Sequence, residues 1–376
     1  MPASDSDVLV VGGGVIGLAC AYRLAAEGAD VRLIDASGAQ GASWAAAGML
    51  APISEATFGE AALTRLTVAA VPRFTALAAE LEAATGSQVG LRRDGTLVVA
   101  FNSDDKAALA RLSAFRSEAG LASEPLTGRQ ARELEPYLAT SVRSGVFAAD
   151  DLSVNNRAYV TTLRAAAEAV GVAFVHEQVG GLLQSSARTH GAVTVTGVTY
   201  EAATTVLCAG SATPKLLDVE VYPVKGQILR LAVPERLSAA GPVLTRTVRG
   251  LVRGSEVYLV PRAGGEVVLG ATSEQQGHDT TVTAGAVYEL LRNAYELLPI
   301  SSEFAFVEAR AGLRPSTPDN GPLVGRVDDG LILATGHYRN GILLSAITSD
   351  AVHELAAGRG LGPEWAAFEP TRFARG

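Results

Sequence analysis

The chain opens with two apolar runs that enclose a glycine-rich turn and a helical pattern. Residues 8–11 are apolar and lead directly into the turn at 12–17, apolar positions then recur at helical spacing to about residue 27, and residues 31–34 are apolar again. Short apolar runs bounded by glycine are typical of buried strands, and an apolar spacing of three to four residues is typical of a helix. The pattern predicts a strand, a turn, a helix and a second strand.

Helical patterns and apolar runs alternate again later in the chain. The helical patterns cover 61–84, 153–171 and 342–356. The apolar runs that predict strands cover 172–175, 193–200, 203–210 and 331–335. Strands that alternate with helices are typical of a parallel sheet covered by helices. These segments predict a discontinuous Rossmann-like domain over residues 1–86, 146–221 and 307–376.

Segments of antiparallel character interrupt this pattern. Asp94-Gly95 between 89–93 and 96–101 predicts a hairpin, because this dipeptide suits the positive φ angles of a tight turn. Helices are expected after Ser103, Thr127 and Thr283, which are suitable capping residues. Further strands are predicted at 224–231, 257–262 and 266–272. We therefore expect an α/β fold, α+β overall, with an antiparallel-sheet plus helix substrate domain inserted over residues 87–145 and 222–306.

The composition agrees with two domains and excludes several classes of partner. A chain of 376 residues, 48% of them apolar, can bury two cores. The net charge of −8 and the lack of Lys/Arg runs argue against nucleic acid as a partner. No stretch of 18 or more uninterrupted apolar residues predicts a membrane span, and the polar, acidic opening does not resemble a secretory signal, so a cytoplasmic protein is expected. Cys20 and Cys208 are interpreted as small core residues.

The glycine turn carries the signature of dinucleotide binding. In such a turn Gly12 makes the tight bend, Gly14 lets the backbone approach a pyrophosphate, and Gly17 lets the helix pack closely on the strand. Free amides at the start of the helix then face the phosphates. Asp35, at the end of the second strand, is placed to accept hydrogen bonds from an adenosine ribose. The alternative is a purely structural glycine turn.

Two further segments predict contacts to the same cofactor. The segment 41–50 consists mainly of small residues, which fill a core poorly but let main chain lie close to a large flat group. A flavin ring suits this position better than a nicotinamide; the alternative is an alanine-rich helix start. Near the C-terminus, residues 309–322 are dense in glycine and proline, and residues 336–341 form a glycine turn between a strand and the last helix. This second turn again places amide donors beside the cofactor.

These motifs together resemble the D-amino-acid oxidase superfamily and, within it, the glycine oxidases. The segments that carry the resemblance are 12–17, 45–50, 258–262, 311–315 and 336–344, and they occur in the family's order from end to end. The resemblance implies a non-covalent FAD and a substrate domain inserted in two pieces. It also implies oxidation of a small amine-bearing acid such as glycine, sarcosine or a small D-amino acid, giving an imine that yields glyoxylate and ammonia, with molecular oxygen reduced to hydrogen peroxide. A role in thiamine thiazole biosynthesis follows from the same resemblance.

The resemblance also assigns the substrate-binding residues. The family's carboxylate clamp corresponds to Arg314 and Arg339, and its substrate-lining tyrosine to Tyr258. A buried carboxylate is best held by the planar, permanently charged fork of an arginine. The alternatives are an arginine at the rim in an ion pair and a tyrosine with a solvated hydroxyl. Ser273 stands where the related enzyme has a methionine, so a wider pocket is expected.

No acid or base catalyst is expected, because a hydride leaves the substrate carbon with help from the amine lone pair. His337 is therefore interpreted as a packing residue, and the other histidines lack metal-ligand spacing. A dehydrogenase with another electron acceptor, a flavin module without catalysis, and a homo-oligomeric state stay open. The predicted cofactor contacts are Gly12, Gly14, Val15, Ile16, Gly17, Asp35, Ser43, Ala46, Ala47, Gly48, Met49, Leu50, Val179, Ala209, Gly210, Arg314, His337, Arg339, Asn340, Gly341 and Ile342.

Overall fold

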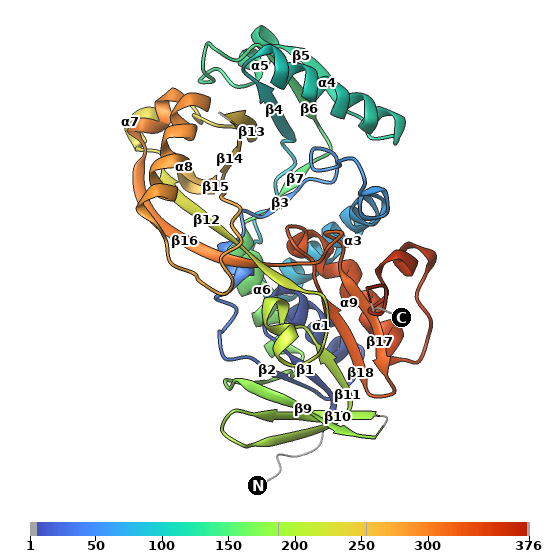
Figure 1. Cartoon of the computed structure of the whole chain (residues 1–376). Coiled ribbons are helices and arrows are strands. Elements are labelled where there is room, and N and C mark those ends of the chain that lie inside the picture. The colour runs from blue at the N-terminus through green and yellow to red at the C-terminus, as the bar shows by residue number, and fades with distance from the viewer. Residues whose placement is uncertain (1–5, 187, 253, 374–376) are drawn as a thin grey trace.

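A computed structural model describes residues 6–186, 188–252 and 254–373. Most of the polar opening stretch that argued against a secretory signal lies outside the described residues. Within the described ranges, the chain forms two eight-stranded sheets with helices packed on them (Figure 1). No helix in these ranges is long and apolar enough to cross a membrane.

The first sheet is a mainly parallel sheet with the strand order β17-β18-β11-β1-β2-β8. An antiparallel β9-β10 hairpin extends it from β11, and β17 runs antiparallel to β18 at the other edge. Its strands are β1 (Ser6–Val11), β2 (Val31–Ile34), β8 (Ala173–Val175), β9 (Val179–Ser185), β10 (Arg188–Thr194), β11 (Thr199–Leu207), β17 (Leu323–Asp328) and β18 (Leu331–Thr335).

Four long helices build the core of this part of the molecule. Helices α1 (Val15–Ala26), α3 (Ala61–Thr85), α6 (Asn156–Ala169) and α9 (Gly341–Ala356) pack against one another beside the first sheet (Figure 1). Leu18, Phe74, Tyr159 and Val352 belong to one buried cluster, so segments from all parts of the chain share a single core. The carboxyl ends of the parallel strands are thereby held in fixed positions.

The second sheet carries the antiparallel character and has the order β16-β12-β15-β14-β13-β4-β6-β5. Helix α8 (Ala284–Leu297) packs on this sheet, Thr283 caps it through the Ala286 amide, and Thr127 forms a capping box for α5 (Gly128–Leu134). The remaining helices are α2 (Ala42–Ala45), α4 (Ser103–Glu118) and α7 (Glu235–Ser238). The strands are β4 (Thr96–Ala100), β5 (Glu124–Thr127), β6 (Ser144–Ala148), β12 (Tyr222–Ala232), β13 (Thr247–Val252), β14 (Ser255–Pro261), β15 (Glu266–Gly270) and β16 (Ala305–Ser316), with a separate pair of β3 (Met49–Leu50) and β7 (Leu152–Ser153).

The predicted hairpin around Asp94-Gly95 is wrong. Gly95 does adopt a positive φ of 76°, but the strand after it, β4, pairs with β6 and β13, while Arg92 bridges to Ser153. The local turn signal is correct, and the partner strands come from distant parts of the chain.

Three further predictions differ in detail. The expected strand 193–200 is the end of β10, a turn containing Gly197 and the start of β11. Asn102, not Ser103, caps α4, because its side chain accepts from the amides of residues 104 and 105. Strand β16 pairs with β12 along its whole length, as far as Ser316, and therefore belongs to the second sheet. The second sheet thus extends past the expected boundary at residue 306.

Candidate functional site

A cavity of about 690 Å³ lies where the two sheets meet. The carboxyl ends of β1, β2, β11 and β18 contribute Val11, Ile34, Cys208 and Thr335 to its wall, and the second sheet contributes residues of β12, β14 and β16. Ligands of open α/β sheets bind at the carboxyl ends of the strands. The cavity is therefore in the expected position for a cofactor that meets a substrate held by the second sheet.

The glycine turn has the geometry that a pyrophosphate requires. Gly12 adopts a φ of 105°, and a Cβ at Gly17 would lie only 1.8 Å from the Gly12 carbonyl oxygen, so the helix packs on the turn as the sequence predicts. A Cβ at Gly14 would meet only the Ser43 hydroxyl at 3.4 Å, which leaves open space over the turn. The Val15 amide donates to Ser43 Oγ over 3.0 Å. Ser43 thus links the turn to the small-residue segment.

The small-residue segment forms one wall of the cavity. It begins with the short helix α2, so an alanine-rich helix start is present, and then continues without regular secondary structure through Ala46, Ala47 and Gly48, which line the cavity. Strand β16 crosses so closely that a Cβ at Gly312 would lie 2.7 Å from the Ala45 Cβ. The part of the cavity beside this wall, the slot, is bordered by small side chains, which leave room for a large planar group.

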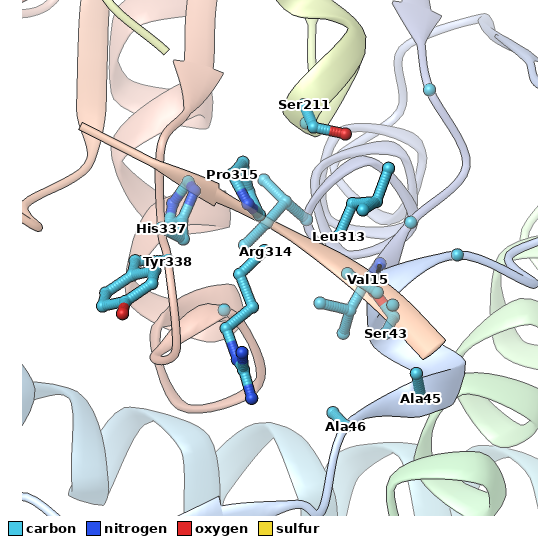
Figure 2. A pocket seen from close by; sticks show the side chains of 18 of the residues that line it. Val15, Ser43, Ala45, Ala46, Ser211, Leu313, Arg314, Pro315, His337 and Tyr338 are labelled. Atoms are coloured by element: carbon cyan, nitrogen blue, oxygen red, sulfur yellow. Dashed lines mark hydrogen bonds between the residues drawn. The ribbon is translucent and has the colours of Figure 1, made fainter. Parts of the chain in front are cut away.

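Arg314 extends from β16 into the cavity, as Figure 2 shows. Its Nη1 donates to the Thr272 carbonyl oxygen over 3.1 Å, and its guanidinium lies over Gly226, where a Cβ would come within 2.4 Å of both Nη atoms. Arg314 forms no ion pair with any residue in the described ranges. The alternative of an ion-paired arginine at the rim therefore does not describe Arg314, whose charge faces the cavity without a balancing carboxylate.

Tyr258 lies beside this guanidinium. Its hydroxyl lies over Gly270, where a Cβ would come within 2.3 Å of it. Burial raises the pKa of Tyr258, and the nearby Arg314 charge opposes that shift. The hydroxyl is therefore protonated at neutral pH and can donate a hydrogen bond into the cavity.

Arg339 lies at the rim of the same cavity, where its side chain is 44% exposed and stacks over the Tyr338 ring. Its Nη1 is 3.8 Å from Glu256 Oε2, and Arg249 pairs with Glu55 over 3.0 Å close by. Arg339 thus forms an ion pair at the rim, which was the alternative to its predicted role in the carboxylate clamp. The Glu55, Arg249 and Glu256 side chains also line the cavity. They were not predicted from the sequence, because Glu55 lies far along the chain from the β13–β14 pair that carries Arg249 and Glu256, and no motif joins them.

His337 lines the cavity as a buried, weakly basic side chain. It is 2% exposed, and its Nε2 lies 3.0 Å from Thr348 Oγ1 on α9. Burial lowers the pKa of His337 to about 3. The side chain is therefore neutral above that pH, which supports its interpretation as a packing residue.

The cavity collects most of the predicted site residues, and Ser273 lies in its wall. The predicted cofactor contacts in its lining are Gly12, Gly14, Val15, Ile16, Asp35, Ser43, Ala46, Ala47, Gly48, Met49, Val179, Ala209, Gly210, Arg314, His337, Arg339, Gly341 and Ile342. Gly17, Leu50 and Asn340 lie outside the lining. Gly17 faces the turn itself, Leu50 is fully buried in the helical core, and Asn340 is the N-cap residue of α9.

The comparisons with known proteins agree with this geometry. The family described as DAO, FAD dependent oxidoreductase, matches residues 7–355. The chain belongs to this family. Its cofactor is FAD, the predicted family and α/β fold are confirmed, and the glycine turn and the slot fit this dinucleotide.

Named relatives are similar over nearly the whole chain. A bifunctional ThiO/ThiG protein of Synechocystis is 36% identical over 98% of this chain, which spans 54% of that relative, or about half its length. Glycine oxidase of Geobacillus kaustophilus is 33% identical over 97% of both proteins. The crystal structure of glycine oxidase from Geobacillus kaustophilus matches with a TM-score of 0.91 at 32% identity, covering 99% of this chain and 100% of that one.

Proposed function

We propose that this protein oxidises glycine, or a similarly small amine-bearing acid, to the imine. The observation that carries the proposal is Arg314, a guanidinium that faces the cavity without an ion-pair partner among the described residues. An unbalanced charge in a partly buried site favours an anion that can make two parallel hydrogen bonds. The carboxylate of an amino acid meets this requirement.

The chain's own residues act by placement. Arg314 binds the substrate carboxylate, Tyr258 donates a further hydrogen bond to it, and Arg339 covers the opening from the rim. Fixing the acid end holds the α-carbon in one orientation, which lowers the entropic part of the barrier. FAD, when bound, supplies the acceptor for the hydride from this carbon.

No side chain is needed as the base. His337 is neutral, its Nε2 lies beside Thr348, and burial lowers its pKa to about 3, so it is a poor proton acceptor at working pH. The substrate therefore reacts with its amine deprotonated, and the lone pair supports loss of the hydride. Hydrolysis of the imine then gives glyoxylate and ammonia.

Three finer points belong to the same proposal. Molecular oxygen takes the electrons and forms hydrogen peroxide, as the name oxidase implies for the Geobacillus relative. The similarity to a ThiO/ThiG protein supports a role in thiamine biosynthesis. The short Ser273 side chain in the cavity wall leaves room for sarcosine, D-alanine or D-proline. A cytoplasmic location and a homo-oligomeric state stay predictions.

Anaerobic mixing of the purified yellow protein with glycine, sarcosine, D-alanine and D-proline tests the proposal. We expect glycine to bleach the yellow flavin absorbance, and subsequent admission of air to restore the colour with release of one peroxide per turnover. Restoration only by an artificial electron acceptor would indicate a dehydrogenase. Failure of every amino acid to bleach the flavin would contradict the proposal and favour a module without catalysis.

A further inference from the structure

Arg262, the residue directly after β14, is a buried cation behind the small-residue wall of the cavity. The residue is 5% exposed, and its Nη2 donates to the carbonyl oxygen of Ala47. Its other two nitrogens, Nε and Nη1, have no hydrogen-bond partner among the described residues. A guanidinium with two unused donors is costly to bury. Its presence therefore indicates a task other than stabilising the fold.

The surroundings leave the charge of Arg262 unbalanced. It forms no ion pair in the described part of the chain, and the nearest acidic neighbour, Glu266, is bound by Arg230. Burial, with the adjacent Arg230 charge, lowers the pKa of Arg262 to about 9, so the side chain is still protonated at neutral pH. A positive charge is thus held against the back of the cavity wall, in contact with the Ala47 carbonyl. Screening of this charge by water is weak in such buried surroundings.

The hydrogen bond from Arg262 also sets the orientation of a peptide group in that wall. The Ala47–Gly48 bond is trans, so the Gly48 N–H points opposite to the Ala47 carbonyl and away from Arg262, and both Ala47 and Gly48 line the cavity. The next carbonyl, that of Gly48, accepts from the Val154 amide over 2.8 Å. The Gly48 amide itself donates to no residue that the structure describes. A peptide that lines the slot therefore carries a donor without an acceptor among the described residues.

Gly48 itself leaves this segment little freedom to move. Its φ is 68°, and a Cβ there would lie 2.1 Å from the Val154 carbonyl oxygen and 3.0 Å from Arg262 Nη2. Only glycine fits between these two groups. Arg262 and Val154 thus hold the wall from behind, and a change at Arg262 alters the side that faces the cofactor.

We propose that Arg262 is a positioning residue for the flavin: it fixes the Ala47–Gly48 peptide so that the Gly48 amide faces the ring, and its buried charge favours the reduced, electron-rich form of the cofactor. The inference concerns the bound FAD alone and does not depend on which amine is the substrate. Neither part of the role requires Arg262 to touch the substrate.

The test is a measurement of the flavin midpoint potential without any amino acid, in the wild-type holoprotein and in Arg262→Met. Loss of the charge and of the charge-assisted hydrogen bond is expected to shift the reduction equilibrium toward oxidised flavin about tenfold, which corresponds to a potential ~30 mV lower for a two-electron couple. The affinity for sulfite, which adds to electron-poor flavins, is expected to fall in parallel. Arg236→Met, which breaks the exposed pair with Glu303, is the control and should leave both values unchanged.

A lower melting temperature with an unchanged potential would overturn the proposal, because it would reduce Arg262 to a structural role. If Arg262→Met does not accumulate as holoprotein, Arg262→Lys decides the question. A lysine buried at this position loses its proton at a lower pH than the arginine does. Its potential should then match the wild type in acid and fall below it as the pH rises. A potential that follows the wild type at every pH would equally overturn the proposal.

Discussion

At the scale of single residues, burial and charge decide what each polar side chain in the cavity can do. Arg314 and His337 both line it, yet Arg314 presents an unpaired charge and His337 is held neutral against α9. Tyr258 keeps its proton because burial raises its pKa. The site thus provides a fixed cation and a hydroxyl donor for an acid, and its histidine is held neutral.

His337 should make the folded protein sensitive to acid. Its folded pKa of about 3 lies below the ordinary value of 6.5, so the stability that this neutral side chain provides is complete above pH 6.5 and is lost as the pH falls toward 3. In urea titrations, the unfolding free energy of the wild type should fall more steeply over this window than that of His337→Gln, by up to about 1.4 kcal/mol per pH unit. The exposed His278→Gln is the control. Equal slopes for the wild type and His337→Gln would count against a buried neutral histidine.

At the scale of elements, close packing of strands positions the clamp. Gly226 on β12 lies directly under the Arg314 guanidinium, which comes from the neighbouring strand β16. Gly226→Ala should therefore displace Arg314 and weaken binding of glycolate, a carboxylate mimic of the substrate, by roughly tenfold or more, since a charge-assisted hydrogen bond contributes about 1.5–3 kcal/mol. FAD should stay bound, because Gly226 belongs to the second sheet. Titration of the flavin spectrum with glycolate measures the effect.

The matched control for this prediction is Gly285→Ala on α8, where a Cβ would meet nothing within 4 Å. Its glycolate affinity should equal that of the wild type. An unchanged affinity in Gly226→Ala would show that the guanidinium does not need the space over this strand, and the described position of the clamp would be incorrect.

Local sequence signals predicted most helices, turns and strands correctly. Strand partners that are far apart in the sequence could not be predicted from such signals. The glycine turn, the Thr283 cap and the strand 331–335 depend on neighbouring residues and agree with the structure. The Asp94-Gly95 hairpin failed because β4 finds its partners in β6 and β13, which no local pattern indicates. In the site, Arg314 stands in a motif and was predicted. The Arg249–Glu55 pair was not predicted, because its two residues are 194 positions apart in the sequence.

At the scale of the whole molecule, the site exists only where the two sheets meet. The first sheet and its helices hold the glycine turn and most of the slot that fits FAD, and the second sheet supplies Arg314 and Tyr258. Arg230 links the two parts, since it donates to Asn156, whose amide donates to the carbonyls of Ser43 and Trp44. The acid site that we propose on the second sheet therefore shares one cavity with the turn that fits FAD, and we expect the flavin spectrum to report the binding of an acid.

The affinity of the FAD-bound protein for glycolate, compared between the wild type and Arg314→Lys, tests the central claim most directly. Arg310→Lys, on the same strand but paired with Glu308, is the control. We expect Arg314→Lys to keep its flavin and to bind glycolate roughly tenfold or more weakly, because a lysine cannot make two parallel hydrogen bonds to a carboxylate. The control should match the wild type. Equal glycolate affinity in the wild type and Arg314→Lys would contradict the assignment of Arg314 as the residue that holds the substrate's acid group.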